Sequence, residues 1–400
     1  MFKLFQNEKD RKYLLILIIL MLLLKVLGSL FVNYYIKKGK MNQGLVYRSE
    51  KVMKQAKISP VIMALGYHWD SIHYVNISYL GKEHFKLVGK EKNFALRNFG
   101  YLFPTIIMIL GWIFRSNILA GVIASNVFSI LTIIAFYHVC RLYLSEEKSF
   151  AASALLMTYP AFFATGLITY SEPAYLFFAI LSWYYFEKED YLMSAVFTGM
   201  ALCVRTSGAI LLGIYFVCFL IRFIKKIKKE KRFSLPPAGC LYYLIPFILF
   251  VISSLITKRI MSSSDVIMWQ DTFSKSIPSA NSYFFPIAPS PKEQIMHFMG
   301  DTKLGLEMYM YILPAIFLGF HLKKINAGLL TYALIAIFSV MCIPMPPVIK
   351  AIPRHLLNAW PIFIAFGELI ENRYFLFVIC TFFFLGGIKT LEYYFTTCYI

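Results

Sequence analysis

Long runs of apolar residues recur along the chain, and they decide what it can fold into. The first run, LLILIILMLLLKVLGSLFVNYY, covers residues 14–35. A helix needs about 20 consecutive apolar residues to cross the ~30 Å hydrocarbon core of a bilayer. Inside that core, only a helix or a closed barrel satisfies the hydrogen bonds of its own backbone. The recurring runs therefore predict an all-α polytopic membrane protein.

We expect about eleven transmembrane helices, within a range of about nine to twelve, because two segments are short for a full span. The expected spans are 13–34, 117–140, 150–168, 172–186, 192–205, 207–224, 238–257, 304–320, 326–343, 356–371 and 374–393. The first run is too long for a signal-peptide core and no small-residue cleavage site closes it, so we expect an uncleaved first span. We expect residues 1–400 to form a single transmembrane domain.

Composition argues against a soluble protein. Of the 400 residues, 59% are hydrophobic and 15% are charged, whereas soluble proteins carry roughly 45–50% and about 25%. The net charge of +19 does not indicate nucleic acid, because much of it lies in short loops, where it orients the chain and meets anionic membrane lipids. The seven Cys form no CxxC pair or zinc-type spacing, and we interpret them as small hydrophobic residues.

Basic residues in alternate short loops predict the orientation. They are those of the N-terminus, Arg141, Lys148, Lys188, Lys225–Arg232, Lys323, Lys324 and Arg373. Basic loops face the cytoplasm, so the N-terminus is expected there. The opposite face then receives two large extracytoplasmic loops, 35–116 and 258–303, and the shorter loop 344–355. Within the first of these, 101–114 suits an interfacial or re-entrant helix, and 41–65 suits a helix lying on the membrane surface.

The first candidate for chemistry is Asp70, in the external segment GYHWDSIHYVNISYLGKEH. A carboxylate near the membrane surface can take the proton of an acceptor hydroxyl as that oxygen attacks a sugar carbon. The alternative is an exposed acid that caps the helix following it.

Aromatic and histidine side chains surround this acid. Tyr67, Trp69 and Tyr74 offer flat faces for a sugar, or else anchor the segment at the interface. We count His73 with them as a substrate-binding candidate. His68, His73 and His84 can be drawn with Asp70 as a metal site, but isolated histidines in loops are usually solvated. We therefore expect no metal site formed by protein ligands alone.

Glu172 is the second candidate, in the segment ITYSEPAYLFF at the outer end of a predicted span. Acidic residues at that depth are rare and usually functional. The alternative is structural: Pro173 fits a first helical turn, with Ser171 as the N-cap and Glu172 beside the positive end of the helix dipole.

Two cationic features lie on the same predicted face. Arg205, in ALCVRTSGAILL, either reaches to the interface as an anchor or grips a phosphate through two hydrogen bonds. Arg354 and His355, with Lys350 as support, precede another span and also suit a donor phosphate, or else form an ordinary basic flank. A base together with cations that hold a phosphate leaving group is what glycosyl transfer from a lipid phosphate requires.

Several segments together resemble a known family. HWDSIHY, FGYLFP, SNVFSILTIIAFYHVCRLY, MTYPAFFATGLITYSEPAYLFFAILSWYYF, CVRTSGAILL and PRHLLNAWP occur in the order seen in PIG-V-type mannosyltransferases, which add the second mannose of the GPI anchor in eukaryotes and have microbial relatives. The resemblance covers 67–225 well and 350–370 modestly. It implies the GT-C fold, a dolichyl- or polyprenyl-phosphate-mannose donor, and a lipid-linked or glycolipid acceptor.

The resemblance also implies roles for individual residues. Asp70 corresponds to the catalytic acid of the family's first external loop, Ser171-Glu172 resembles its Tyr-Ser-Glu element, and Arg205 resembles its Arg-Ser-Asn-Gly element. The sequence departs from the family at FGYLFP, where the family has Phe-Pro-Leu-Tyr-Pro, and at Thr206-Ser207. Those departures concern the acceptor more than the reaction class. Because the Lys-rich, Arg-poor composition suggests an AT-rich microbe, we expect a plasma membrane location (the endoplasmic reticulum if eukaryotic), and we do not infer GPI synthesis.

Other functions stay open on the sequence alone. A related transferase could use another hexose or acceptor. A flippase or transporter of lipid-linked saccharides would need ionisable groups deeper in a central cavity. An O-antigen-type polymerase or ligase relies chiefly on external arginines and lacks the Trp-Asp element. The sequence identifies no definite cofactor, and a divalent cation, Mg²⁺ or Mn²⁺, that bridges the donor phosphate is an open option.

Overall fold

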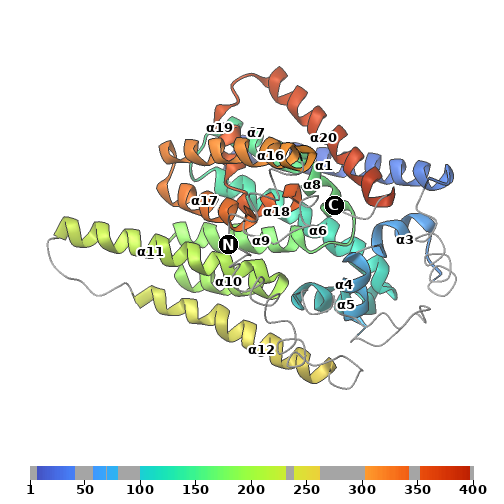
Figure 1. The fold of residues 1–400 in the computed structure, drawn as a ribbon, viewed down its shortest axis with the longest axis horizontal. Coiled ribbons are helices and arrows are strands. Elements are labelled where there is room, and N and C mark those ends of the chain that lie inside the picture. Colours follow the sequence, from blue (N-terminus) through green and yellow to red (C-terminus); the bar gives the residue numbers. More distant parts are fainter. Residues whose placement is uncertain are drawn as a thin grey trace.

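The computed structural model describes residues 7–40, 57–68, 70–79, 100–230, 238–261, 302–341 and 352–396. All regular elements in these ranges are helices (Figure 1). They are α1 (Glu8–Lys37), α3 (Pro60–Gly66), α4 (Asp70–Ser78), α5 (Leu102–Phe114), α6 (Asn117–Cys140), α7 (Glu146–Thr158), α8 (Pro160–Leu167), α9 (Glu172–Glu187), α10 (Tyr191–Val204), η2 (Thr206–Gly208), α11 (Ala209–Glu230), η3 (Ala238–Tyr243), α12 (Leu244–Met261), α16 (Thr302–His321), η4 (Leu322–Lys324), α17 (Ala327–Met341), α18 (Ile352–His355), η6 (Leu356–Ala359), α19 (Ile362–Leu369) and α20 (Arg373–Thr396).

A helix lies at each predicted span, and α6 has the predicted bounds. Within the described ranges, α1, α6 and α20 are long and apolar enough to cross a membrane, and the bent pair α7 and α8 would make a fourth span. Shorter apolar helices include α5 and α10. The described part of the chain is therefore all-helical, as in a polytopic membrane protein, and the count of about eleven spans stays a prediction. The predicted loop 258–303 lies largely outside the described residues.

The segment predicted as one span, 150–168, is instead two helices that meet at an angle of 64°. Tyr159 separates them with a non-helical backbone, at φ −53° and ψ 128°. Pro160 is the cause, because its ring pushes the preceding residue out of the helical region and it has no N–H for the helix hydrogen bond. Proline is well suited to start the next helix, α8.

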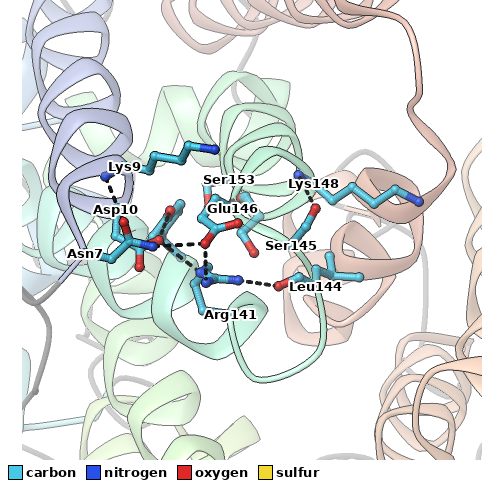
Figure 2. Close-up of polar contacts among 11 residues, drawn as sticks. Asn7, Lys9, Asp10, Arg141, Leu144, Ser145, Glu146, Lys148 and Ser153 are labelled. Atoms are coloured by element: carbon cyan, nitrogen blue, oxygen red, sulfur yellow. Dashed lines mark hydrogen bonds and ion pairs between the residues drawn. The ribbon is translucent and has the colours of Figure 1, made fainter.

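Polar contacts fix one end of the helices (Figure 2). The Asp10 carboxylate accepts hydrogen bonds from Tyr137 Oη at 2.5 Å and Arg141 Nε at 2.9 Å. Arg141 also pairs with Glu146 at 2.9 Å, and Asn7 donates to the same Glu146 oxygen at 3.0 Å. The start of α1 is thereby fastened to the end of α6 and the start of α7.

An aromatic core joins the helices that carry the candidate residues. The Trp183 ring of α9 stacks on Tyr215 of α11 with centroids 6.1 Å apart, and it meets Tyr332 of α17 edge-on at 5.5 Å. Trp360 Nε1 donates to Tyr332 Oη at 2.9 Å. These buried rings bring the segment after α18 against α9, so the C-terminal part of the chain packs onto the middle of the molecule.

Large apolar side chains also cover the outside. Leu30 on α1 is 58% exposed, and Phe377 and Phe382 on α20 are 71% and 73% exposed. So much exposed apolar surface on a folded chain indicates contact with lipid rather than water.

Candidate active site

Two carboxylates and two guanidiniums meet at one end of the helices. They come from four segments that lie far apart in the sequence: Asp70 begins α4, Glu172 begins α9, Arg205 follows the last residue of α10, and Arg354 lies in α18. Three ion pairs connect these segments: Arg205 pairs with Glu172, and Arg354 pairs with both Asp70 and Glu172. The sequence placed all four on one face, and the structure brings them together.

Arg354 is the residue that joins the two acids. Its Nη1 donates to Asp70 Oδ2 at 2.9 Å, and its Nε lies 3.4 Å from Glu172 Oε1. The guanidinium also lies over the Tyr170 ring, 5.3 Å from the centroid, as in a cation–π contact. Burial alone would lower the pKa of Arg354, but the charges of Glu172 and Asp70 raise that pKa above its ordinary value.

Arg205 holds the other side of Glu172. Its Nη1 lies 2.5 Å from Glu172 Oε1 and donates to Ser171 Oγ at 3.2 Å. Ser171 Oγ also shares a 2.6 Å hydrogen bond with Tyr74 Oη. Ser171 occupies the N-cap position of α9 without a side-chain capping bond, so its hydroxyl serves the cluster and not the helix end.

Glu172 is the most buried of the four charges, with only 4% of its side chain exposed. Neither of its oxygens has a hydrogen-bond partner among the described residues, although both arginines lie within ion-pair distance. Asp70 is much more open, with 36% of its side chain exposed. Burying a carboxylate costs free energy even where arginines pair with it, so the arrangement favours a role for Glu172 beyond starting a helix.

The turn around Arg205 depends on a close backbone approach. A Cβ on Gly208 would lie 2.5 Å from the Cα of Leu202, closer than real Cβ atoms come. Glycine therefore lets η2 fold back against α10 and directs the Arg205 side chain toward Glu172.

Asp70 is placed by the C-terminal helix. Tyr394 Oη of α20 donates to the His68 carbonyl at 2.7 Å and lies 3.3 Å from Ser71 Oγ. His68 itself is fully buried beside Tyr394 and Phe395, and its Nδ1 lies 3.3 Å from the Met63 carbonyl. Burial lowers the pKa of His68 to about 4, so its ring is neutral at pH 7.

The remaining predicted site residues take varied positions. Tyr74 is buried, with its ring edge-on to Phe103 at 5.2 Å, and Tyr67 is buried with its Oη donating to Asn76 at 3.1 Å. Because both rings are buried within the protein, they are better suited to positioning the residues around Asp70 than to stacking on a sugar. His73 is partly buried one turn from Asp70. Trp69, His84 and Lys350 lie outside the described residues.

His355 follows Arg354 but differs from it in charge. Burial and the neighbouring positive charges of Arg354 and Arg205 hold the pKa of His355 well below its ordinary value. Its imidazole is therefore neutral near pH 7. If it contacts a phosphate, it does so as a hydrogen-bond donor and not as a cation.

Two contributors escaped prediction from sequence. Tyr170 supports Arg354 from within the same Tyr-Ser-Glu element, and its position beside Glu172 was the available signal. Tyr394 fixes the start of α4 from 326 residues away, and no local pattern in an apolar C-terminal helix announces such a contact.

The chain also matches a known protein family. The sequence model described as Mannosyltransferase (PIG-V) matches residues 8–259, a region that includes Asp70, Glu172 and Arg205 and ends before Arg354. A comparison with curated proteins found no match. The family match covers more than half of the chain and agrees with the all-helical membrane fold. The chain therefore belongs to the PIG-V mannosyltransferase family, and it is a membrane-bound hexosyltransferase.

Proposed function

We propose that this mannosyltransferase takes its mannose from a dolichyl- or polyprenyl-phosphate carrier and passes it to a hydroxyl of a lipid-linked or glycolipid acceptor. The observation that carries the proposal is the meeting of Arg205 and Arg354 with Asp70 and Glu172 at one end of the helices. Guanidiniums grip phosphate oxygens through paired hydrogen bonds, and a carboxylate beside them is suited to accept a proton.

The proposed reaction is a single displacement. The acceptor oxygen forms a bond to the anomeric carbon of mannose as its proton passes to a carboxylate. The bond between that carbon and the phosphate oxygen breaks, and the carrier phosphate leaves with the electron pair. Arg205 and Arg354 stabilise the charge that develops on the leaving phosphate.

Asp70 suits the role of base better than Glu172. Its side chain is 36% exposed, against 4% for Glu172, so an acceptor hydroxyl reaches it more readily. Glu172 contacts both guanidiniums, and we assign it to holding them in place for the phosphate.

The orientation of the helices supports an extracytoplasmic site. Glu172 is at the first residue of α9, whereas Glu187 at its last residue pairs with Arg222 of α11 at 2.8 Å. From there α11 continues to Glu230 through the lysine-rich segment, and Figure 1 shows α11 extending away from α3, α4 and α5. The cluster therefore lies at the end opposite the most basic loop, which the charge rule assigns to the cytoplasm. The GT-C fold and a microbial plasma membrane location belong to the same proposal.

The direct test is transfer by purified protein in detergent or liposomes. Radiolabelled polyprenyl-phosphate-mannose is supplied with candidate lipid acceptors, with and without EDTA, and the products are identified. We expect a mannosylated lipid and free polyprenyl phosphate. Transfer from a nucleotide sugar but not from the lipid phosphate would overturn the donor assignment, and loss of activity with EDTA would establish the divalent cation.

A further inference from the structure

Lys25 is an ionisable residue deep within the apolar helix α1. It is only 8% exposed, and it lies 15 residues after Asp10, or about 22 Å along the helix axis. Its Nζ donates to Asn126 Oδ1 at 2.8 Å and to the Gly166 carbonyl at 2.7 Å. Ionisable residues inside membrane helices are costly and usually serve function, and the proposed reaction does not use this one directly.

The Gly166 carbonyl belongs to the last turn of α8, where a helix leaves its carbonyl groups without partners. Asn126 Nδ2 donates to the next carbonyl, that of Leu167, at 3.3 Å. Lys25 and Asn126 together therefore cap the end of this half-helix. A cation is also favourable at the negative, C-terminal end of a helix dipole.

The chain then leaves the helix from Ile168 to Tyr170, and α9 starts with Glu172 after its N-cap residue Ser171. Non-helical backbone at membrane depth is tolerated only where protein satisfies it. Ser125 satisfies the backbone of Tyr170: its Oγ accepts from the Tyr170 N–H and donates to the Tyr170 carbonyl, each at 3.0 Å. Thr132 Oγ1 donates to the Pro173 carbonyl at 2.8 Å. Side chains of α6 thus brace this link from the end of α8 to the start of α9.

Close packing supports the same geometry. A Cβ on Gly121 of α6 would lie 2.6 Å from Thr169 Cγ2, and a Cβ on Gly28 of α1 would lie 2.9 Å from Leu167 Cδ2. Glycine at these two positions lets α6 and α1 approach the link closely enough for the hydrogen bonds to form.

We propose that Lys25 and Asn126 are positioning residues, which cap α8 and thereby set the place of the Tyr170–Glu172 segment in the active site. Tyr170 carries the Arg354 guanidinium, Ser171 accepts from Arg205, and Glu172 pairs with both arginines. A shift of the α8 end is passed to all three contacts. The catalytic part of this inference rests on the proposed function, whereas the structural part does not.

The test compares Lys25→Met, Lys25→Arg and Asn126→Ala with the parent in liposomes. The matched control is Ser153→Ala, because Ser153 Oγ is buried and donates to the Ser149 carbonyl within its own helix, α7. Hydrogen exchange is read by mass spectrometry in a peptide over 166–172, where the Thr169 amide donates to Leu65 and the Tyr170 amide to Ser125. Mannose transfer is measured at saturating donor.

For Lys25→Met we expect at least about tenfold faster exchange in 166–172, with unchanged exchange in α10. We expect kcat to fall by about 10- to 100-fold, because small displacements of catalytic groups cost that much, while the KM for acceptor stays close to the parent value. Lys25→Arg should restore part of both effects. Asn126→Ala should reproduce them, and it replaces Lys25→Met if that variant does not insert.

Parent-like exchange and kcat in both Lys25→Met and Asn126→Ala would overturn the proposal. A uniform rise in exchange that includes α10, with kcat of the folded fraction unchanged, would also overturn it. That result would mean that the two residues stabilise the whole fold and do not position the Tyr170–Glu172 segment. If the parent itself does not use polyprenyl-phosphate-mannose, the proposed function fails, and the exchange measurement still decides the positioning role.

Discussion

Arg354 Nη1 donates to Asp70 Oδ2 across 2.9 Å, although 284 residues separate the two in the sequence. The arginine proposed to bind the donor phosphate thus also holds the proposed base. A phosphate that binds Arg354 competes with Asp70 for the same guanidinium. Donor binding should therefore leave the Asp70 carboxylate freer to accept a proton, which couples readiness of the base to the presence of donor.

Replacing Asp70 with Asn should nearly abolish turnover. The amide keeps the shape and can still accept one hydrogen bond from Arg354, but it cannot take the proton of the acceptor hydroxyl. General-base catalysis is worth about 10²- to 10⁴-fold, so we expect a loss of that size in kcat with donor binding retained. Single-turnover transfer and a separate donor-binding titration measure the two quantities.

Glu172→Gln is the matched comparison for that experiment. If Glu172 only holds the arginines, its loss should raise the KM for donor more than it lowers kcat. Transfer at close to the parent rate by folded Asp70→Asn would refute Asp70 as the base, and Glu172 would then be the leading candidate.

Replacing Arg205 or Arg354 with Ala should weaken donor use strongly. Loss of a hydrogen bond to a charged group costs about 1.5–3 kcal/mol, which corresponds to about 10- to 150-fold in kcat/KM for donor. Lys should restore activity only in part, because an ammonium lacks the planar fork of a guanidinium. Steady-state assays over a donor series give the values.

Arg373→Ala is the control for these variants, since Arg373 is 87% exposed and its ion pair to Glu147 spans 3.5 Å. It should leave donor use unchanged. Equal donor dependence in the parent and in both Ala variants at positions 205 and 354 would return the two arginines to the role of interfacial anchors.

His68 should make the fold less stable in mild acid. Its pKa falls from the ordinary 6.5 to about 4 on burial, so the unfolded chain binds a proton that the folded chain excludes. The stabilisation of the neutral ring is complete above about pH 6.5 and is lost as the pH falls toward 4. At pH 5 the loss is about 2 kcal/mol, from about 1.4 kcal/mol per pH unit.

Thermal or denaturant unfolding at pH 5 and pH 7.5, compared between the parent and His68→Asn, isolates this effect from carboxylates that titrate in both proteins. The parent should lose more stability than the variant between the two pH values. An equal loss in both proteins would show that His68 does not account for it.

The two ends of the helices should lie on opposite sides of the membrane. On a Cys-free background, single Cys residues replace Lys38, which follows α1, and Lys228, near the end of α11; both positions are exposed. An impermeant maleimide added to intact cells should label position 38 and not 228. Position 189, exposed after α9, is the control and should behave like 228. Labelling of 38 and 228 from the same side would contradict the topology.

Much of the fold was predictable because membrane helices can be recognised from the length of their apolar segments. The predicted span at 117–140 has the same bounds as α6, since Ser116 caps its start and basic Arg141 follows its end. The break at Pro160 was missed because residues 150–168 read as one apolar segment. Proline at the first turn of a new helix and proline inside a kinked one give the same local pattern.

The candidate site was predictable as a set of charges but not as a geometry. Asp70, Glu172, Arg205 and Arg354 stand out because charge beside apolar segments is costly. Which acid pairs with which arginine depends on helix packing over hundreds of residues, as the Arg354–Asp70 contact shows. Lys25 was visible as a lone charge in the first apolar run, but its role depends on the end of a half-helix that the sequence did not reveal.

The capping contact of Lys25 has a consequence for how the protein is made. Its partner carbonyl at Gly166 lies 141 residues further along the chain, and ribosomes add roughly 5–20 residues per second, so Lys25 waits about 7–28 s for that partner. During this interval an uncompensated ammonium lies in an otherwise apolar helix. We therefore expect the insertion machinery to retain α1 in a hydrated or protein-lined site until α6 and α8 have emerged, so that the first helix settles into the lipid no earlier than α8.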